Sequence, residues 1–173
     1  LTEGMDLDAV QSAMTAAASQ ANRAIREEAA RKPEYAGMGT TLVSAVSGKD
    51  GIVVANVGDS RAYRITAEGI QRITRDHSLV ESMVERGDIT EEEARRHPNR
   101  NLITRALGTD ETVESDGYRT ALSAGEYLLL CTDGLTITVT DQEMLFEILH
   151  GGAEESCLSR LLAIAREHGA PDN

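Results

Sequence analysis

The chain has 173 residues, of which 40% are hydrophobic, and its formal net charge at pH 7 is −12. This length and hydrophobic content predict a single globular domain over residues 1–173 and exclude a disordered tail or a repeat array. The negative charge disfavours nucleic-acid binding, because affinity for a phosphate backbone comes mostly from lysine and arginine. No window approaches the roughly 18 uninterrupted apolar residues of a membrane span. A basic-then-apolar leader is also missing at the N-terminus, so we expect a cytoplasmic protein that makes no membrane contact.

The first predicted element is an amphipathic helix. Apolar residues recur at helical spacing from about Asp6 to Ala30, and Lys32-Pro33 ends the pattern. Four β-rich runs follow, separated by short glycine-containing turns, so we expect an antiparallel meander. The four runs are Thr40–Ser47, Ile52–Val57, Arg61–Thr66 and Ile70–Thr74.

The middle of the chain is charged and helical. The apolar residues between Leu79 and Val84 predict one short helix, and Thr90-Glu-Glu-Glu93 is a capping box that opens a second. Two strands and two helices are then predicted. The strands are Asp116–Ala121 and Tyr127–Thr132, and the helices begin after the cap at Thr140 and at Ala153.

Three aspartates need an explanation for their positions: Asp76, Asp133 and Asp172. Asp133 ends the apolar run that begins at Tyr127, and a charge at the edge of a core needs a metal, a cation or water beside it. Each aspartate also has an alternative interpretation. Asp133 and Asp172 both suit turns, and Asp76 can cap the helix that follows it.

Six segments, in this order, resemble the motifs of the PP2C-type (PPM) metal-dependent protein serine/threonine phosphatases, in particular the bacterial branch. The resemblance implies an α+β fold, a four-layer α-β-β-α sandwich of two antiparallel sheets flanked by helix pairs, here incomplete. It also implies a flap subdomain at about residues 75–108. The six segments are Gly37–Thr41, Ala55–Tyr63, Thr74–Ser78, His97–Gly108, Leu130–Leu135 and Gly169–Asn173.

The resemblance also implies a chemistry. These phosphatases hold two Mn²⁺ or Mg²⁺ ions, which activate a bridging water for attack on phosphoserine or phosphothreonine. Hard divalent cations prefer such oxygen ligands. By motif match, Asp133 and Asp172 resemble carboxylates of the core metal site, and Asp76 resembles the residue that holds a third ion together with Asp133. The expected partners are phosphorylated proteins, substrates of a serine/threonine kinase, and the expected oligomeric state is a monomer.

Two departures from the family pattern suggest an alternative. The family's first two signatures, an Asn-Glu-Asp stretch and an Asp-Gly-Met-Gly-Gly turn, and its last strand do not occur here, so we expect an excerpt of a larger catalytic domain. Ile137 stands where many relatives carry an acidic residue. The alternative is a catalytically inactive interaction or regulatory module of the same fold. His77 and His97 do not occupy the place of a catalytic histidine and are expected to be flap or packing residues.

Overall fold

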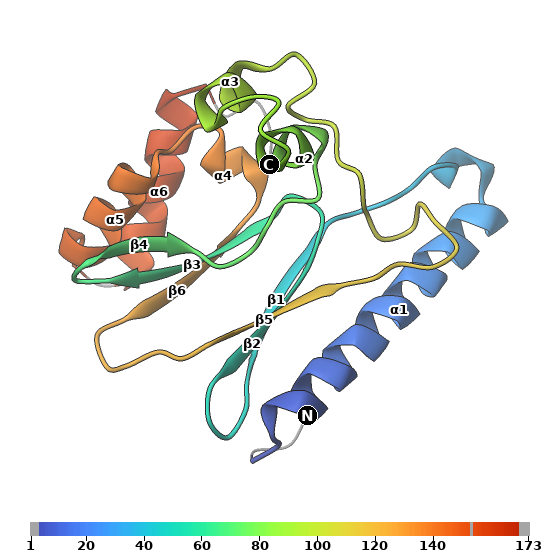
Figure 1. Ribbon diagram of the computed structural model, residues 1–173, viewed down its shortest axis with the longest axis horizontal. Coiled ribbons are helices and arrows are strands. Elements are labelled where there is room, and N and C mark those ends of the chain that lie inside the picture. The colour runs from blue at the N-terminus through green and yellow to red at the C-terminus, as the bar shows by residue number, and fades with distance from the viewer. Residues whose placement is uncertain (1–3, 153, 170–173) are drawn as a thin grey trace. The chain divides into compact units, whose positions relative to one another are not determined.

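A computed structural model describes residues 4–152 and 154–169, which belong to two compact units (Figure 1). The first unit comprises the chain up to Ser60 together with Arg75–Ala121, and the second comprises Arg61–Thr74 and the chain from Leu122 onward. Each unit contains one three-stranded antiparallel sheet and its own helices. The predicted α+β class with two antiparallel sheets is therefore confirmed. Within the described ranges, no helix combines the length and the apolar character needed to cross a membrane.

The first unit is built on a hairpin that the long N-terminal helix covers. In this hairpin β1 pairs with β2, and β2 pairs with β5 on its other side. Val10 and Met14 of α1 pack against Val53 and Ala55 of β2, which accounts for the apolar spacing of the helix. The elements are α1 (Leu7–Arg31), the 3₁₀ turn η1 (Pro33–Tyr35), β1 (Leu42–Ser47), β2 (Ile52–Val57) and β5 (Asp116–Thr120).

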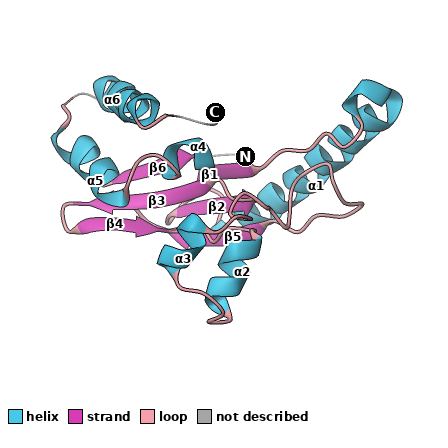
Figure 2. Ribbon diagram, turned by 90° about the horizontal axis from the view of Figure 1, so that it is seen from above, coloured by secondary structure: helices cyan, strands magenta, loops and turns pink. Residues whose placement is uncertain are grey.

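In the chain, the predicted helical insert lies between β2 and β5 of this first unit. Helices α2 (Leu79–Glu85) and α3 (Glu91–Arg96) contact each other and lie side by side in Figure 2. The predicted capping box is present: the Thr90 side chain accepts a hydrogen bond from the Glu93 backbone, and the Glu93 side chain accepts one from the Thr90 backbone.

The second unit contains a three-stranded sheet and the helices α4, α5 and α6. The strand order of this sheet is β4-β3-β6. Its core consists of Tyr63, Ile65 and Leu129 from the strands, together with residues of α5 and α6 that include the fully buried Met144. The elements are β3 (Arg61–Thr66), β4 (Gly69–Arg72), β6 (Tyr127–Cys131), α4 (Asp133–Thr136), α5 (Asp141–His150) and α6 (Glu154–Glu167).

The predicted four-strand meander is wrong. β1 and β2 form one hairpin, and β3 and β4 form another that belongs to a different sheet. The connection after β2 is not a hairpin turn, because both backbone hydrogen-bonding groups of Gly58 bond to His77. The Gly58 N–H donates to His77 Nδ1 at 3.0 Å, and the Gly58 carbonyl accepts from the His77 N–H at 2.9 Å. A contact across 19 residues thus replaces the local turn.

One ion pair of the second unit predicts a measurable pH dependence. The Glu126 carboxylate accepts hydrogen bonds from Arg64 Nη2 at 2.7 Å and Nε at 3.1 Å, and this pairing holds the pKa of Glu126 below its ordinary 4.5. Because the folded pKa is the lower one, the pair stabilises the fold above pH 4.5, and this stabilisation is lost as the pH falls through the folded pKa. Between about pH 5 and pH 3, the free energy of unfolding should fall more steeply in the wild type than in Glu126→Gln. Urea denaturation measures both slopes, and parallel slopes would contradict the assignment.

Candidate active site

Asp76 is a buried carboxylate of the first unit, with only 7% of its surface exposed. It lies two residues before the N-cap of α2, which is Ser78: the Ser78 hydroxyl accepts a hydrogen bond from the Glu81 N–H at 3.2 Å. The alternative that Asp76 caps this helix is therefore wrong. A carboxylate that is buried here for another reason remains a candidate ligand for a cation.

Asn56 and Tyr118 fix the backbone just before Asp76. The Asn56 side chain is fully buried in β2, and its amide donates to the carbonyls of Arg75 at 3.0 Å and of Gly58 at 3.2 Å. From β5, the Tyr118 hydroxyl accepts a hydrogen bond from the Arg75 N–H at 3.1 Å. Two strands of the sheet thus hold the residue that precedes the carboxylate.

His77 fixes the backbone just after Asp76. Because its Nδ1 accepts the Gly58 N–H, the ring carries its proton on Nε2, which lies 3.3 Å from Asp116 Oδ2. Arg105 Nη1 contacts the other oxygen of Asp116 at 2.7 Å. Burial lowers the pKa of His77 and outweighs the opposing effect of Asp116, so the ring is neutral at pH 7. His77 is thus a packing residue, as expected, that also ties β2 and β5 to the segment around Asp76.

The segment that follows α3, residues 97–108, runs beside the residues around Asp76. We call this segment the returning arm of the insert. The Leu79 N–H donates to the Leu102 carbonyl at 2.9 Å, the Thr104 N–H donates to the His77 carbonyl at 2.7 Å, and Ser78 and Ile103 form an isolated antiparallel bridge. Residues 102–104 therefore lie next to the backbone that carries Asp76.

Asp133 lies in the second unit, where it is the first residue of the one-turn helix α4 and not a turn residue. Strand β6 ends two residues earlier at Cys131. The Ile137 N–H donates to the Asp133 carbonyl at 2.9 Å, which places Ile137 one helical turn beyond the carboxylate. The Ile137 side chain is 42% exposed. This apolar side chain therefore occupies the surface on the same side of α4 as Asp133.

The donor chemistry at these positions fits a hard divalent cation, because both described candidates offer carboxylate oxygens. In the ranges 4–152 and 154–169, no group of three or more His, Cys, Asp or Glu residues is arranged to hold a metal. Asp76 belongs to the first unit and Asp133 to the second, whereas Asp172 lies outside the described residues. The described residues thus offer single candidate ligands and not a complete metal site.

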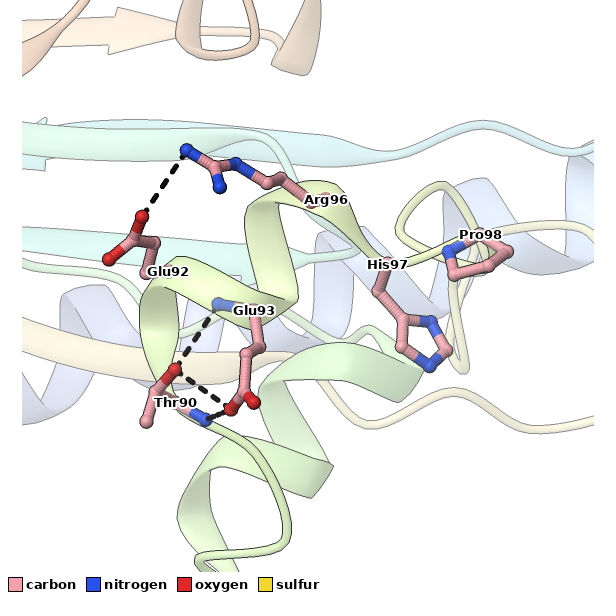
Figure 3. Close-up of a pocket in the computed structure, with 6 residues that line it drawn as sticks. All are labelled: Thr90, Glu92, Glu93, Arg96, His97 and Pro98. Carbon is pink, nitrogen blue, oxygen red and sulfur yellow. Dashed lines mark hydrogen bonds and ion pairs between the residues drawn. The ribbon is translucent and has the colours of Figure 1, made fainter.

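A shallow pocket of the first unit lies over α3 (Figure 3). Its acidic side chains already have partners, since Glu92 pairs with Arg96 at 3.2 Å and Glu93 completes the capping box with Thr90. His97, expected to be a flap or packing residue, accepts the Asn99 N–H at its Nδ1 at 3.1 Å. The side chains that line this pocket are therefore engaged in contacts that hold the insert together.

Comparisons with known proteins cover both units. Residues 2–162 match the family model of protein phosphatase 2C. The serine/threonine phosphatase stp of Listeria welshimeri is 42% identical over 125 residues, which are 72% of this chain and 50% of that protein. The chain therefore spans about half the length of this curated relative.

Solved structures extend the likeness to the fold. The crystal structure of the serine/threonine phosphatase Stp1 from Staphylococcus aureus is similar at a TM-score of 0.92 and 38% identity, over 97% of this chain and 66% of that chain. The catalytic domain of the phosphatase PstP, solved in complex with two manganese ions, has a TM-score of 0.79 at 33% identity, over 92% of this chain and 66% of that chain.

Proposed function

Since this chain belongs to the protein phosphatase 2C family, which is metal-dependent, we propose that it is part of an active protein serine/threonine phosphatase. Its substrates would be proteins that carry phosphoserine or phosphothreonine, products of a serine/threonine kinase. The observation that supports this most is the likeness to serine/threonine phosphatases through both units of the fold.

The three aspartates would supply the metal ligands of this segment. Asp133 and Asp172 would contribute to the site of two core Mn²⁺ or Mg²⁺ ions, and Asp76 would hold a third ion together with Asp133. When bound, such ions lower the pKa of a bridging water and neutralise phosphoryl charge. Residues 75–108 would form the flap.

The contribution of the protein itself would be to orient Asp76 and Asp133 before substrate arrives. Asn56 and His77 hold the backbone on both sides of Asp76, and the helical turn of α4 holds Asp133 at the end of β6. Groups fixed during folding need no reorganisation at the moment of reaction, which favours catalysis.

Metal removal tests this function. The chain, expressed with the sequence that flanks it in its gene, should release phosphate from a phosphothreonine peptide in Mn²⁺. Activity should disappear when EDTA removes the ion and should return with excess Mn²⁺. Turnover that persists in EDTA, or none with either Mn²⁺ or Mg²⁺, would contradict the proposal. The second result would instead favour the inactive module.

A further inference from the structure

Asp116, the first residue of β5, has three polar side chains within hydrogen-bonding distance. Arg105 Nη1 donates to its Oδ1 at 2.7 Å, and the Tyr118 hydroxyl donates to its Oδ2 at 3.3 Å. His77 Nε2 lies 3.3 Å from the same Oδ2. Burial opposes ionisation, but the hydrogen bonds from Arg105 and His77 outweigh it and hold the pKa of Asp116 below its ordinary 3.8. At neutral pH Asp116 is therefore an anion that only accepts hydrogen bonds.

Two chains of hydrogen bonds end on this carboxylate. In one, the Arg75 N–H donates to the Tyr118 hydroxyl at 3.1 Å, and Tyr118 uses its own proton on Asp116. In the other, the Gly58 N–H donates to His77 Nδ1 at 3.0 Å, so the proton of the ring is on Nε2, beside Asp116. Both chains run from a backbone N–H through one side chain to the same acceptor. The direction of each chain thus depends on a group that cannot donate.

Arg105 shows which arrangement the carboxylate prevents. Its Nη1 lies 3.1 Å from His77 Nε2, but an arginine nitrogen can only donate. Both hydrogens of this Nη1 have acceptors, namely Asp116 Oδ1 and the Glu114 carbonyl at 3.0 Å. If Asp116 offered no acceptor, Arg105 could donate to Nε2 only after the ring proton had moved to Nδ1. That proton would then face the Gly58 N–H, and the hydrogen bond between His77 and Gly58 would be lost.

We propose that Asp116 is a positioning residue: it fixes the tautomer of His77 and thereby the backbone around Asp76. This inference rests on the proposed function, in which Asp76 binds a metal ion. Through Tyr118, Asp116 also orients the acceptor of the N–H just before Asp76. Side chains that orient a metal ligand from outside the coordination shell typically change metal affinity by about 10- to 100-fold. We expect the lower end of this range, because Asp116 acts through a second side chain.

The tautomer of His77 can be measured without catalysis. The experiment is a long-range proton–nitrogen NMR correlation spectrum of the isotope-labelled protein, expressed with its flanking sequence, in which His77→Gln assigns the ring. The wild type should show the neutral Nε2–H form. Asp116→Asn replaces one acceptor oxygen with an amide donor. Because the charged Arg105 keeps the remaining oxygen, a donor then faces Nε2, and His77 should change to the Nδ1–H form. An Nδ1–H ring in the wild type, or an unchanged tautomer in Asp116→Asn, would overturn the inference.

Calorimetry of Mn²⁺ binding measures the effect on the metal ligand. Asp76→Asn identifies the binding step that belongs to Asp76. In Asp116→Asn the Kd of that step should rise about 10-fold, and the Kd of every other step should stay unchanged. Asp110→Asn is the matched control, because it makes the same change at an exposed position in the loop before β5. Its tautomer and its Kd values should equal those of the wild type.

Tyr118→Phe tests the other chain of hydrogen bonds. It should raise the same Kd but leave His77 in the Nε2–H form. A wild-type Kd in both Tyr118→Phe and Asp116→Asn would overturn the inference, as would an equal rise in Asp110→Asn or an Asp76→Asn variant that loses no binding step. A protein that binds Mn²⁺ but does not hydrolyse a phosphothreonine peptide would fail as a phosphatase, and the tautomer and the Kd would still decide the role of Asp116.

Discussion

The variant Asp133→Asn is expected to lose at least about 100-fold in kcat on a phosphothreonine peptide, because losing the proposed metal ligand should cost more than the 10- to 100-fold typical of an outer-shell partner. The amide keeps the size of the side chain but removes the negative charge that a hard cation prefers. Phosphate release across a Mn²⁺ titration measures the effect, and excess metal should recover only part of the rate.

Asp50→Asn is the matched control for this variant, since it makes the same change at an exposed position in the turn between β1 and β2. It should leave the rate unchanged. Circular dichroism should give both variants the unfolding temperature of the wild type, so that a lost rate is not a lost fold. A wild-type kcat in Asp133→Asn would exclude ligation by Asp133.

The variant Asn56→Leu is expected to destabilise the protein by about 1–3 kcal/mol, because the Arg75 carbonyl loses its hydrogen bond from the buried Asn56 amide. The Gly58 carbonyl also loses the Asn56 amide, but it keeps the His77 N–H at 2.9 Å. Urea denaturation measures the loss. Because Arg75 immediately precedes Asp76, the Mn²⁺ concentration for half-maximal activity should also rise.

Asn101→Leu provides the comparison, because Asn101 is exposed in the returning arm of the insert. It should change the free energy of unfolding by no more than about 0.5 kcal/mol, as is usual for a surface substitution. Equal stability of Asn56→Leu and Asn101→Leu would mean that other donors replace the Asn56 amide.

The sequence predicted those features that arise from neighbours along the chain. Helix α1 was expected from about Asp6 to Ala30 and spans Leu7–Arg31, because helical periodicity and the stop at Lys32-Pro33 are local. The expected strands Ile52–Val57 and Arg61–Thr66 have the same bounds in the structure. Alternation and turns define a strand locally but do not choose its partner.

The errors and omissions arise from contacts between distant residues. The meander prediction was wrong at the connection after β2, where the N–H and the carbonyl of Gly58 both bond to the distant His77. The contacts of Asp116 with His77 and Arg105 join residues far apart in sequence and leave no local pattern. Helix α4 has only four residues, too few for a period. Asn56 did give a signal, as a polar residue inside the apolar run of β2, since a buried amide must find partners.

The hydrogen bonds to Arg75 have a consequence for the motion of the chain. One of the points at which the backbone passes from the second unit into the first lies between Thr74 and Arg75. The first residue after this crossing is tied at its N–H by Tyr118 and at its carbonyl by Asn56. The crossing peptide therefore enters the first unit at a residue whose N–H and carbonyl are both bonded to that unit's sheet, so the backbone that carries Asp76 should follow the first sheet. In hydrogen exchange, the Arg75 and His77 amides should accordingly exchange together with the first sheet and not with the connection.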